Sequence, residues 1–221
     1  MRAAIFDMDG TLFDTEQIYR EAWLKVAEPF GLEPNPELGK AVSGTGGFIT
    51  LNIIYSFYPE QNPQDLSKWV EDYVFEESGK HLDIMQGVPE ILEYFKSQNF
   101  KLAVASGTET ATVGRNLKNA KLKEYFSVVI GGDMIHDGGK PRPGIFLKAV
   151  EELGIPAEEC YVFEDAFNGI RAAFDAKCVP ILVNPYDEYS KATPEIKSEM
   201  DKKSRKIFLN MNDALDWIKN Q

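Results

Sequence analysis

Short uninterrupted runs of apolar residues recur along the chain, and none of them alternates cleanly with polar residues. A strand that is solvated on one face shows such an alternation, whereas a strand covered on both faces reads as a continuous apolar run. The runs therefore predict buried strands of a parallel sheet. They are Ala3–Phe6, Leu102–Ala105, Val128–Ile130, Tyr161–Phe163, Val179–Val183 and Ile207–Leu209.

Helical spacing separates the later runs. Residues 88–97 carry apolar side chains at intervals of three and four, which predicts a helix. Thr110–Ala120 and Ile145–Leu153 show a similar pattern, and Gly154 stands where a helix often ends in glycine. Strand and helix therefore alternate from about residue 86 onward, which predicts an α/β fold with a doubly wound parallel sheet.

The segment between the first two strands differs, because it has helical patterns and no strand-like run. We therefore predict a helical domain at residues 15–86, inserted into a core of residues 1–14 and 87–221. Its expected helices are Ile18–Val26, Pro36–Val42, Phe48–Phe57 and Leu66–Phe75. Near the other end, the polar stretch Tyr186–Arg205 predicts a surface loop and a short helix.

The charge balance limits the partners that the chain can bind. Its 221 residues include 24 Lys and Arg against 35 Asp and Glu, which gives a net charge of −11. Nucleic acids and anionic membranes repel such a surface, so we expect neither as a partner. A small anionic molecule is compatible, provided that local cations or a metal ion neutralise it.

The cysteine content and the first residues indicate the cellular context. Cys160 and Cys178 are too few for a disulfide framework and are expected to be buried thiols. Asp7 comes too early for a signal peptide, and the uncharged stretch Ala41–Pro59 is too polar to span a membrane. We therefore expect a cytoplasmic protein and, with nothing that calls for an oligomer, a monomer.

Acidic residues follow two of the predicted strands. Asp7 and Asp9 come directly after the first strand and precede Gly10, which permits a tight turn. Glu164 and Asp165 follow the strand Tyr161–Phe163 in the same way. Ligands bind open α/β sheets at the carboxyl ends of the strands, where these acids would repel each other unless a cation lies between them. The pattern predicts a site for a hard cation such as Mg²⁺, with one acid free to act as a nucleophile or general acid.

Two further segments contribute polar groups. Ser106, Gly107 and Thr108 end the strand Leu102–Ala105, where a hydroxyl and free backbone N–H groups would suit a phosphoryl oxygen. The same residues also occur in ordinary turns. Lys140 lies in a loop rich in glycine and proline, and would neutralise an anionic substrate. A solvated surface lysine is the alternative.

Taken together, these segments resemble the haloacid dehalogenase-like superfamily of phosphohydrolases, and within it the β-phosphoglucomutase-like group with a helical cap. The resemblance extends from Phe6 to about Val183. It implies that Asp7 attacks phosphorus and becomes an aspartyl phosphate, and that Asp9 protonates the leaving oxygen and later activates water. Ser106 would hydrogen-bond the phosphoryl group, and Lys140 would neutralise charge.

The resemblance also implies a magnesium site and a substrate-binding cap. Mg²⁺ would be held by Asp7, the backbone carbonyl of Asp9, and Asp165, with Glu164 in support. The acid at position 9 resembles the members of the superfamily that act on phosphate esters. The dehalogenases lack an acid there, because a halide leaving group needs no proton. Within the cap, Thr15 and Lys40 are candidates for contacting the substrate, as are Gly107 and Thr108 in the core.

Several positions depart from the family pattern. Gly144 stands where the family usually has an acid after Lys-Pro-x-Pro, and Ala166 where serine is common. His136, in the loop before Lys140, is expected to be a surface histidine. Tyr19 and Gly44 occupy the positions where β-phosphoglucomutases have a histidine and a phosphate-gripping arginine.

Loss of those two groups favours a hydrolase over a mutase. The expected function is a magnesium-dependent phosphatase that hydrolyses a small organic phosphomonoester, such as a sugar phosphate. The alternatives are a sugar phosphate mutase and an inorganic pyrophosphatase of the same fold. A signalling receiver domain also has an acidic pocket with a lysine, but receivers are shorter and have no helical insertion.

Overall fold

The computed structural model describes residues 2–42, 45, 47–185, 189 and 191–221. The chain divides into two compact units, Met1–Asp14 with Ile84–Gln221, and Thr15–Asp83. The chain returns from the helical unit to the first unit between Asp83 and Ile84. This boundary is slightly earlier in the chain than the one expected between residues 86 and 87. Residues 84–86 belong to the first unit because Ile84 pairs with Phe13, and the Met85 amide donates to the Leu12 carbonyl at 2.9 Å.

The first unit is built on a six-stranded sheet in the order β3-β2-β1-β4-β5-β6, with every neighbouring pair parallel. This confirms the predicted doubly wound α/β fold. The last strand ends at Phe208, and Leu209 is 75% exposed outside it. The strands are β1 (Ala3–Phe6), β2 (Lys101–Ala105), β3 (Val128–Ile130), β4 (Cys160–Glu164), β5 (Val179–Val183) and β6 (Lys206–Phe208).

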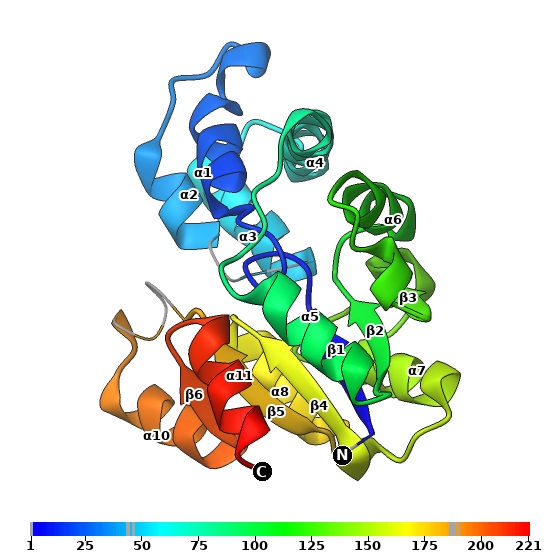
Figure 1. Cartoon of the computed structure of the whole chain (residues 1–221). Helices are drawn as coiled ribbons and strands as arrows, with labels where there is room; N and C mark the ends of the chain where they lie inside the picture. The colour runs from blue at the N-terminus through cyan, green and yellow to red at the C-terminus, as the bar shows by residue number, and fades with distance from the viewer. Residues whose placement is uncertain (1, 43–44, 46, 186–188, 190) are drawn as a thin grey trace. The chain divides into compact units, whose positions relative to one another are not determined.

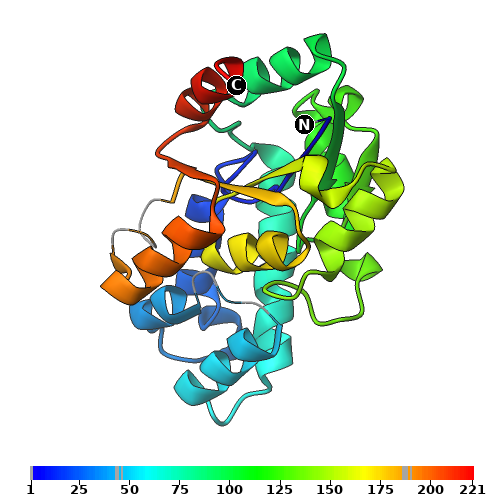
Figure 2. The same ribbon diagram turned by 90° about the horizontal axis from the view of Figure 1, so that it is seen from below.

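Helices cover both faces of the sheet, which explains why its strands are apolar throughout. Helices α5 (Val88–Ser97) and α11 (Met211–Lys219) pack together on one face. Helices α7 (Gly144–Leu153) and α8 (Phe167–Asp175) contact the strands from the other face, where α10 (Pro194–Lys203) packs against α8. Figure 1 shows α5 and α11 in front of the sheet, and the view in Figure 2 shows α8 and α10 on the opposite side.

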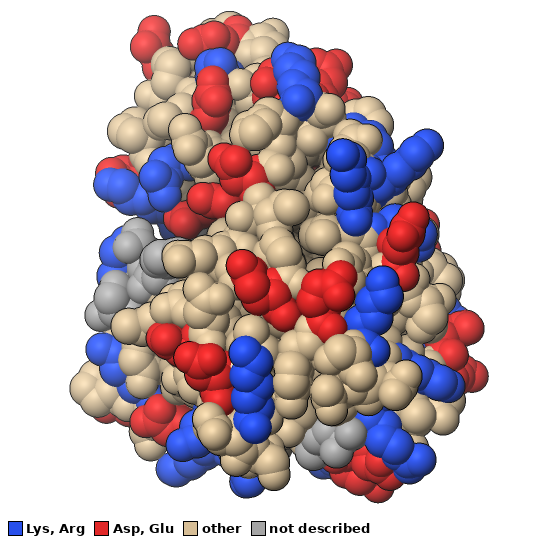
Figure 3. All heavy atoms as spheres, in the orientation of Figure 1, with Lys and Arg blue, Asp and Glu red and all other residues tan. Residues whose placement is uncertain are grey.

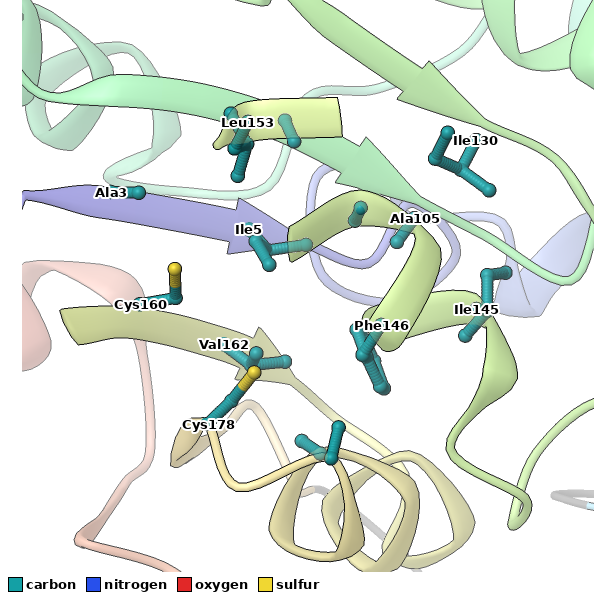
Figure 4. Close-up of a cluster of buried hydrophobic side chains, with 14 of the residues drawn as sticks. Ala3, Ile5, Ala105, Ile130, Ile145, Phe146, Leu153, Cys160, Val162 and Cys178 are labelled. Carbon is teal, nitrogen blue, oxygen red and sulfur yellow. The ribbon is translucent and has the colours of Figure 1, made fainter. Parts of the chain in front are cut away.

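Alternate strand residues divide between the two faces. On the α7 and α8 face, a cluster includes Ile5, Ala103 and Val162 together with Phe146 of α7 (Figure 4). Cys160 and Cys178 belong to the same cluster as free thiols. Burial raises the pKa of Cys160 to about 11 and that of Cys178 to about 12, so both thiols are unreactive at neutral pH. The prediction of buried thiols is confirmed.

The opposite face is aromatic. The rings of Phe6 and Phe163 stack with centroids 4.7 Å apart. Phe95 of α5 meets both of them edge-on, at 6.2 Å and 5.9 Å, and Trp217 of α11 meets Tyr161 in the same way at 6.2 Å. These contacts fix α5 and α11 on the sheet, and they buttress the strands whose ends carry Asp7 and Glu164.

The second unit is helical. It contains α1 (Glu16–Lys25), α2 (Pro36–Val42), α3 (Gly47–Phe57) and α4 (Pro63–Lys80), which surround an apolar cluster of their own. The longest, α4, begins earlier than predicted because the Asn62 side chain caps it by accepting from the Gln64 amide at 3.3 Å. Among the described residues, the structure has no helix long and apolar enough to span a bilayer.

Two helices lie near the end of the chain, one predicted from the sequence and one not. The polar stretch after residue 186 contains α10, which begins at a threonine cap, Thr193. Helix α11 was not predicted, although Asn210 caps it through the Asp213 amide at 3.0 Å. Helix α6 (Thr110–Asn119) follows β2 as predicted. Figure 3 shows acidic side chains interspersed with basic ones on the face that it presents.

The aromatic face yields a stability prediction. Phe95→Ala is expected to lower the free energy of unfolding by about 3–5 kcal/mol, because it leaves a cavity between α5 and the sheet. Leu209→Ala, at a side chain that is 75% exposed, should change it by less than about 0.5 kcal/mol. Urea unfolding followed by circular dichroism measures both, and equal effects would contradict the assigned core.

Candidate active site

The strand order places the acidic segments side by side. The connections from β1 run toward β2 and β3, whereas β4 to β6 extend in the opposite direction, so the order reverses between β1 and β4. Such a switch point is where open α/β sheets bind ligands, beyond the carboxyl ends of the strands. Asp7 follows β1 and its amide donates to the Phe163 carbonyl at 3.0 Å, while Glu164 is the last residue of the neighbouring β4 and Asp165 follows it.

Lys140 connects the two acidic segments. Its ammonium lies 2.5 Å from Asp7 Oδ1 and 2.5 Å from Glu164 Oε1. The lysine side chain is 15% exposed and those of Asp7 and Glu164 are 7% and 1% exposed. The loop containing Lys140 comes before α7, and the ammonium also lies 5.1 Å from the centre of the Phe146 ring. The alternative of a solvated surface lysine is therefore excluded by the geometry.

Burial shapes the protonation of this group. Desolvation, with repulsion from Glu164 and Asp9, holds the pKa of Asp7 well above its ordinary value, although Lys140 opposes the shift. Burial and repulsion from Glu164 and Asp7 raise the pKa of Asp165 in the same direction. For Lys140, burial lowers the pKa, but the two carboxylates outweigh it and raise the pKa overall. The lysine is therefore charged, whereas burial and mutual repulsion oppose the full ionisation of Asp7 and Asp165.

The donor set fits a hard divalent cation. Carboxylate oxygens of Asp7, Glu164 and Asp165 lie within 4.8 Å of one another. When all three acids are ionised, one ammonium leaves an excess of two negative charges, even before Asp9 is counted. Oxygen donors of this kind are those that Mg²⁺ prefers. The residues present therefore fit a magnesium ion.

Glu164 is held differently from the other two acids. Its Oε1 accepts from Lys140, and its Oε2 accepts from the amide of Ala166 at 2.9 Å. A Cβ on Gly169 of α8 would lie 1.8 Å from Oε1, so glycine at this position makes room for the carboxylate. Ala166 contributes through its backbone amide, so the absence of the family's serine leaves this bond intact.

Asp165 is positioned by the turn after β1. Gly10 has a φ of +76°, which favours glycine, and a Cβ there would lie 2.1 Å from Asp165 Oδ2. The Thr11 hydroxyl donates to Asp165 Oδ1 at 3.4 Å. The tight turn predicted from Gly10 is present, and it also brings the backbone of one acidic segment against the side chain of the other.

Asp9 is bound by the segment after β2. Its Oδ2 accepts from the Thr108 hydroxyl at 2.8 Å and from the Ser106 hydroxyl at 3.3 Å. The Thr108 amide in turn donates to Ser106 Oγ at 3.1 Å. Ser106 is fully buried, whereas Gly107 is exposed. The structure therefore brings Ser106 and Thr108 to Asp9, a contact that the sequence reasoning did not anticipate.

Sequence reasoning also missed Asn184. This residue follows β5, is 4% exposed, and donates from Nδ2 to the Gly10 carbonyl at 3.2 Å. Its φ of +49° is one that asparagine tolerates better than most side chains. Asn184 directly follows the carboxyl end of β5. A search for polar residues at the end of every predicted strand would therefore have found it, as it found the acids.

The expected substrate-binding residues of the helical unit are described within that unit. Thr15 precedes α1, and its carbonyl accepts from the Tyr19 amide at 3.1 Å. Lys40 is exposed and pairs with Glu37 at 2.7 Å. Gly44 lies outside the described residues. In the sheet-containing unit, His136 is exposed, as predicted for a surface histidine.

Comparisons with known proteins agree with this geometry. The pattern of the haloacid dehalogenase-like hydrolases matches residues 4–183. The phosphorylated carbohydrates phosphatase of Thermotoga maritima is 35% identical over 177 residues, covering 80% of this chain and 82% of that protein. The fructose-1-phosphate phosphatase YqaB of Escherichia coli is 33% identical over 172 residues, covering 76% of this chain and 89% of that protein.

A solved structure shows the same fold. The β-phosphoglucomutase from Clostridium difficile superposes with a TM-score of 0.76 at 22% identity, and covers 100% of this chain and 96% of its own. That likeness concerns the fold alone, whereas the family pattern spans both acidic segments and the lysine between them. The chain is therefore an enzyme of the haloacid dehalogenase-like hydrolase family.

Proposed function

We propose that the chain is a magnesium-dependent phosphatase that hydrolyses a small organic phosphomonoester, with Asp7 as the nucleophile. The observation that carries the proposal is the ammonium of Lys140, 2.5 Å from Asp7 Oδ1 at the switch point of the sheet. Phosphoryl transfer depends mainly on positioning and on neutralising charge, and this arrangement supplies both. The names of the two curated relatives support a phosphorylated sugar as the substrate class.

The first half-reaction transfers the phosphoryl group to the enzyme. A carboxylate oxygen of Asp7 attacks phosphorus, the bond from phosphorus to the ester oxygen breaks, and an aspartyl phosphate forms. Asp9 donates a proton to the departing oxygen, so the product leaves as an alcohol. Lys140 stabilises the charge on the transferred group. The hydroxyls of Ser106 and Thr108, which bind Asp9 here, hold the acid near the site.

The second half-reaction releases phosphate. Asp9, now a carboxylate, takes a proton from a water molecule whose oxygen attacks phosphorus. The bond from phosphorus to Asp7 breaks, and the Asp7 carboxylate is regenerated. Asp9 alternates between acid and base, which requires that it stay close to the reacting phosphorus. Its Oδ2 accepts from the Ser106 and Thr108 hydroxyls in the segment after β2, whereas Lys140 bonds to Asp7 and Glu164.

Magnesium would be held by the carboxylates of Asp7 and Asp165 and by the backbone carbonyl of Asp9. When bound, it supplies positive charge that offsets the excess on the carboxylates and the phosphate. Glu164 has each carboxylate oxygen bonded to the protein and therefore acts by orienting Lys140 and Ala166. The hydrogen bonds of Glu164 support this proposed division between two ligands and one supporting acid.

The helical unit is proposed to be the cap that selects the substrate. Both of its connections leave the core next to the acidic turn, because Phe13 pairs with Asp9 and with Ile84. Thr15 and Lys40 remain candidate substrate contacts. Tyr19 packs in the apolar cluster of this unit and offers no imidazole, which supports hydrolysis over phosphate migration.

The first prediction tests the proposed activity. The wild-type chain should release phosphate from sugar phosphates in the presence of Mg²⁺, and Asp7→Asn should lower turnover at least about 1000-fold because an amide is a poor nucleophile. The melting temperature of the variant should show a folded protein. A malachite-green assay over a panel that includes pyrophosphate and β-glucose 1-phosphate measures this.

Other outcomes of that panel discriminate the alternatives. Consumption of β-glucose 1-phosphate without phosphate release would identify a mutase, and preferential cleavage of pyrophosphate would identify a pyrophosphatase. Ordinary turnover by Asp7→Asn would contradict the assignment of the nucleophile.

The second prediction concerns charge repulsion in the metal-free protein. The pKa of Asp165 is raised in the folded protein, so its protonated carboxyl group costs the folded state little free energy. The free-energy cost of its ionised form grows as the pH rises above the ordinary pKa of 3.8. In EDTA at pH 7, Asp165→Asn should therefore melt higher than the wild type, by roughly 2–4 °C for each kcal/mol relieved.

The same experiment tests the magnesium site. Mg²⁺ should raise the melting temperature of the wild type and have a much smaller effect on Asp165→Asn, because binding stabilises the folded state. Differential scanning fluorimetry with Mg²⁺ or EDTA measures both. A wild type that is indifferent to Mg²⁺ and more stable than the variant in EDTA would rule out this account of the acidic cluster.

A further inference from the structure

We infer that Asp137 is a positioning residue for Lys140: its carboxylate ties both ends of the loop that carries the lysine. The inference rests on the proposed function, since it assigns Asp137 to the catalytic lysine. The contacts of Asp137 run to the backbone of Gly139 and Gly144 and to the Arg142 side chain. It acts through the backbone on either side.

The hydrogen bonds of Asp137 surround the lysine in sequence. Its Oδ1 accepts from the Gly139 amide at 2.9 Å, and its Oδ2 accepts from the Gly144 amide, also at 2.9 Å. Gly144 is the first residue of α7, so the carboxylate also caps this helix from upstream in the chain. The Arg142 guanidinium donates to the Asp137 carbonyl, which closes the loop from a third point. One side chain thus joins the start of the loop to the rigid helix after it.

The loop needs such a tie because of its own sequence. Gly138 and Gly139 have φ values of +97° and +75° and come directly before Lys140. Glycine gains more freedom than any other residue when it is not constrained, so two in succession would let the lysine swing. The two hydrogen bonds of Asp137 span these glycines. They restrict the backbone of Lys140 to the position from which its ammonium contacts Asp7 and Glu164.

Gly144 supports the same assignment. A Cβ built on Gly144 would lie 2.3 Å from Asp137 Oδ2, so a side chain at position 144 and the carboxylate of Asp137 exclude each other. The family usually has an acid at this position. In this chain, the acidic group next to the lysine loop comes from residue 137, and glycine at 144 is what makes room for it.

Misplacement of the ammonium should appear in turnover rather than in substrate affinity. A displacement of about 1 Å in a catalytic group can cost about 100-fold in rate. Asp137→Ala should therefore lower kcat by about 10- to 100-fold and change KM for the best substrate by less than about threefold. Asp137→Asn keeps one acceptor oxygen in place of two and should fall between Asp137→Ala and the wild type.

A double-mutant cycle separates positioning from a general loss of stability. Gly144→Ala alone displaces the Asp137 carboxylate and should lower kcat as Asp137→Ala does. Once Asp137 is alanine, adding Gly144→Ala should have no further effect on kcat, because the carboxylate that it displaces has already been removed. The double variant should also melt no lower than Asp137→Ala, since alanine favours a helix more than glycine does.

Asn210→Ala is the matched control. It removes a side-chain cap from α11, as Asp137→Ala does from α7, and both should lower the melting temperature by about 2–4 °C. The kcat of Asn210→Ala should equal that of the wild type. A fall in kcat shared by Asp137→Ala and Asn210→Ala would mean that the role of Asp137 is only structural.

Further outcomes would overturn the inference without touching the proposed function. A wild type that is active, with Asp137→Ala within about twofold of its kcat, removes the positioning role. Additive effects of Asp137→Ala and Gly144→Ala also contradict it. A wild type that hydrolyses none of the phosphomonoesters instead counts against the proposed function. The link between Asp137 and Gly144 is then tested by the melting temperatures of the single and double variants alone. Additive losses there would refute the tie, and coupled losses would support it.

Discussion

The ammonium of Lys140, held between the carboxylates of Asp7 and Glu164, is the interaction on which the rest of the site depends. It joins three segments that are distant in sequence, at N–O distances of 2.5 Å. Buried carboxylates of this kind are costly unless a cation lies among them. One lysine offsets part of that cost, and burial together with repulsion among the carboxylates raises the pKa of Asp7 and that of Asp165. The same carboxylates make the site suited to a divalent cation and a phosphate together.

Glycines give the carboxylates their places. A Cβ would approach Asp165 to 2.1 Å from Gly10, Glu164 to 1.8 Å from Gly169, and Asp137 to 2.3 Å from Gly144. Gly10 and Asp165 come from segments distant in sequence, whereas Gly169 and Gly144 lie within a few residues of the acids that they accommodate. The sheet places the acids at one edge, and the glycines let them pack against the neighbouring backbone. The positions of these carboxylates therefore depend on glycine at the neighbouring positions.

Much of this arrangement could be predicted because it follows from patterns that are local in sequence. Continuous apolar runs identified the strands, and acids or hydroxyls directly after them identified Asp7, Asp9, Ser106 and Asp165. Helix α11 was missed although its buried residues Met211, Ala214, Leu215 and Ile218 recur at helical spacing, so the pattern that identified the other helices would also have identified this one. The role of Asp137 and the contact of Thr108 with Asp9 depend instead on how loops fold after the strands. Hydrogen bonds of that kind leave no periodic trace.

The account stands on Asp7 as the residue that becomes phosphorylated. Its most direct test is to quench the enzyme during turnover, reduce the protein with borohydride, and examine the peptide that contains residue 7 by mass spectrometry. An acyl phosphate on Asp7 is reduced to homoserine, so the account predicts homoserine at position 7 only when substrate and Mg²⁺ are both present. An unmodified Asp7 in an enzyme that is turning over, with homoserine at another acid or at none, would contradict it.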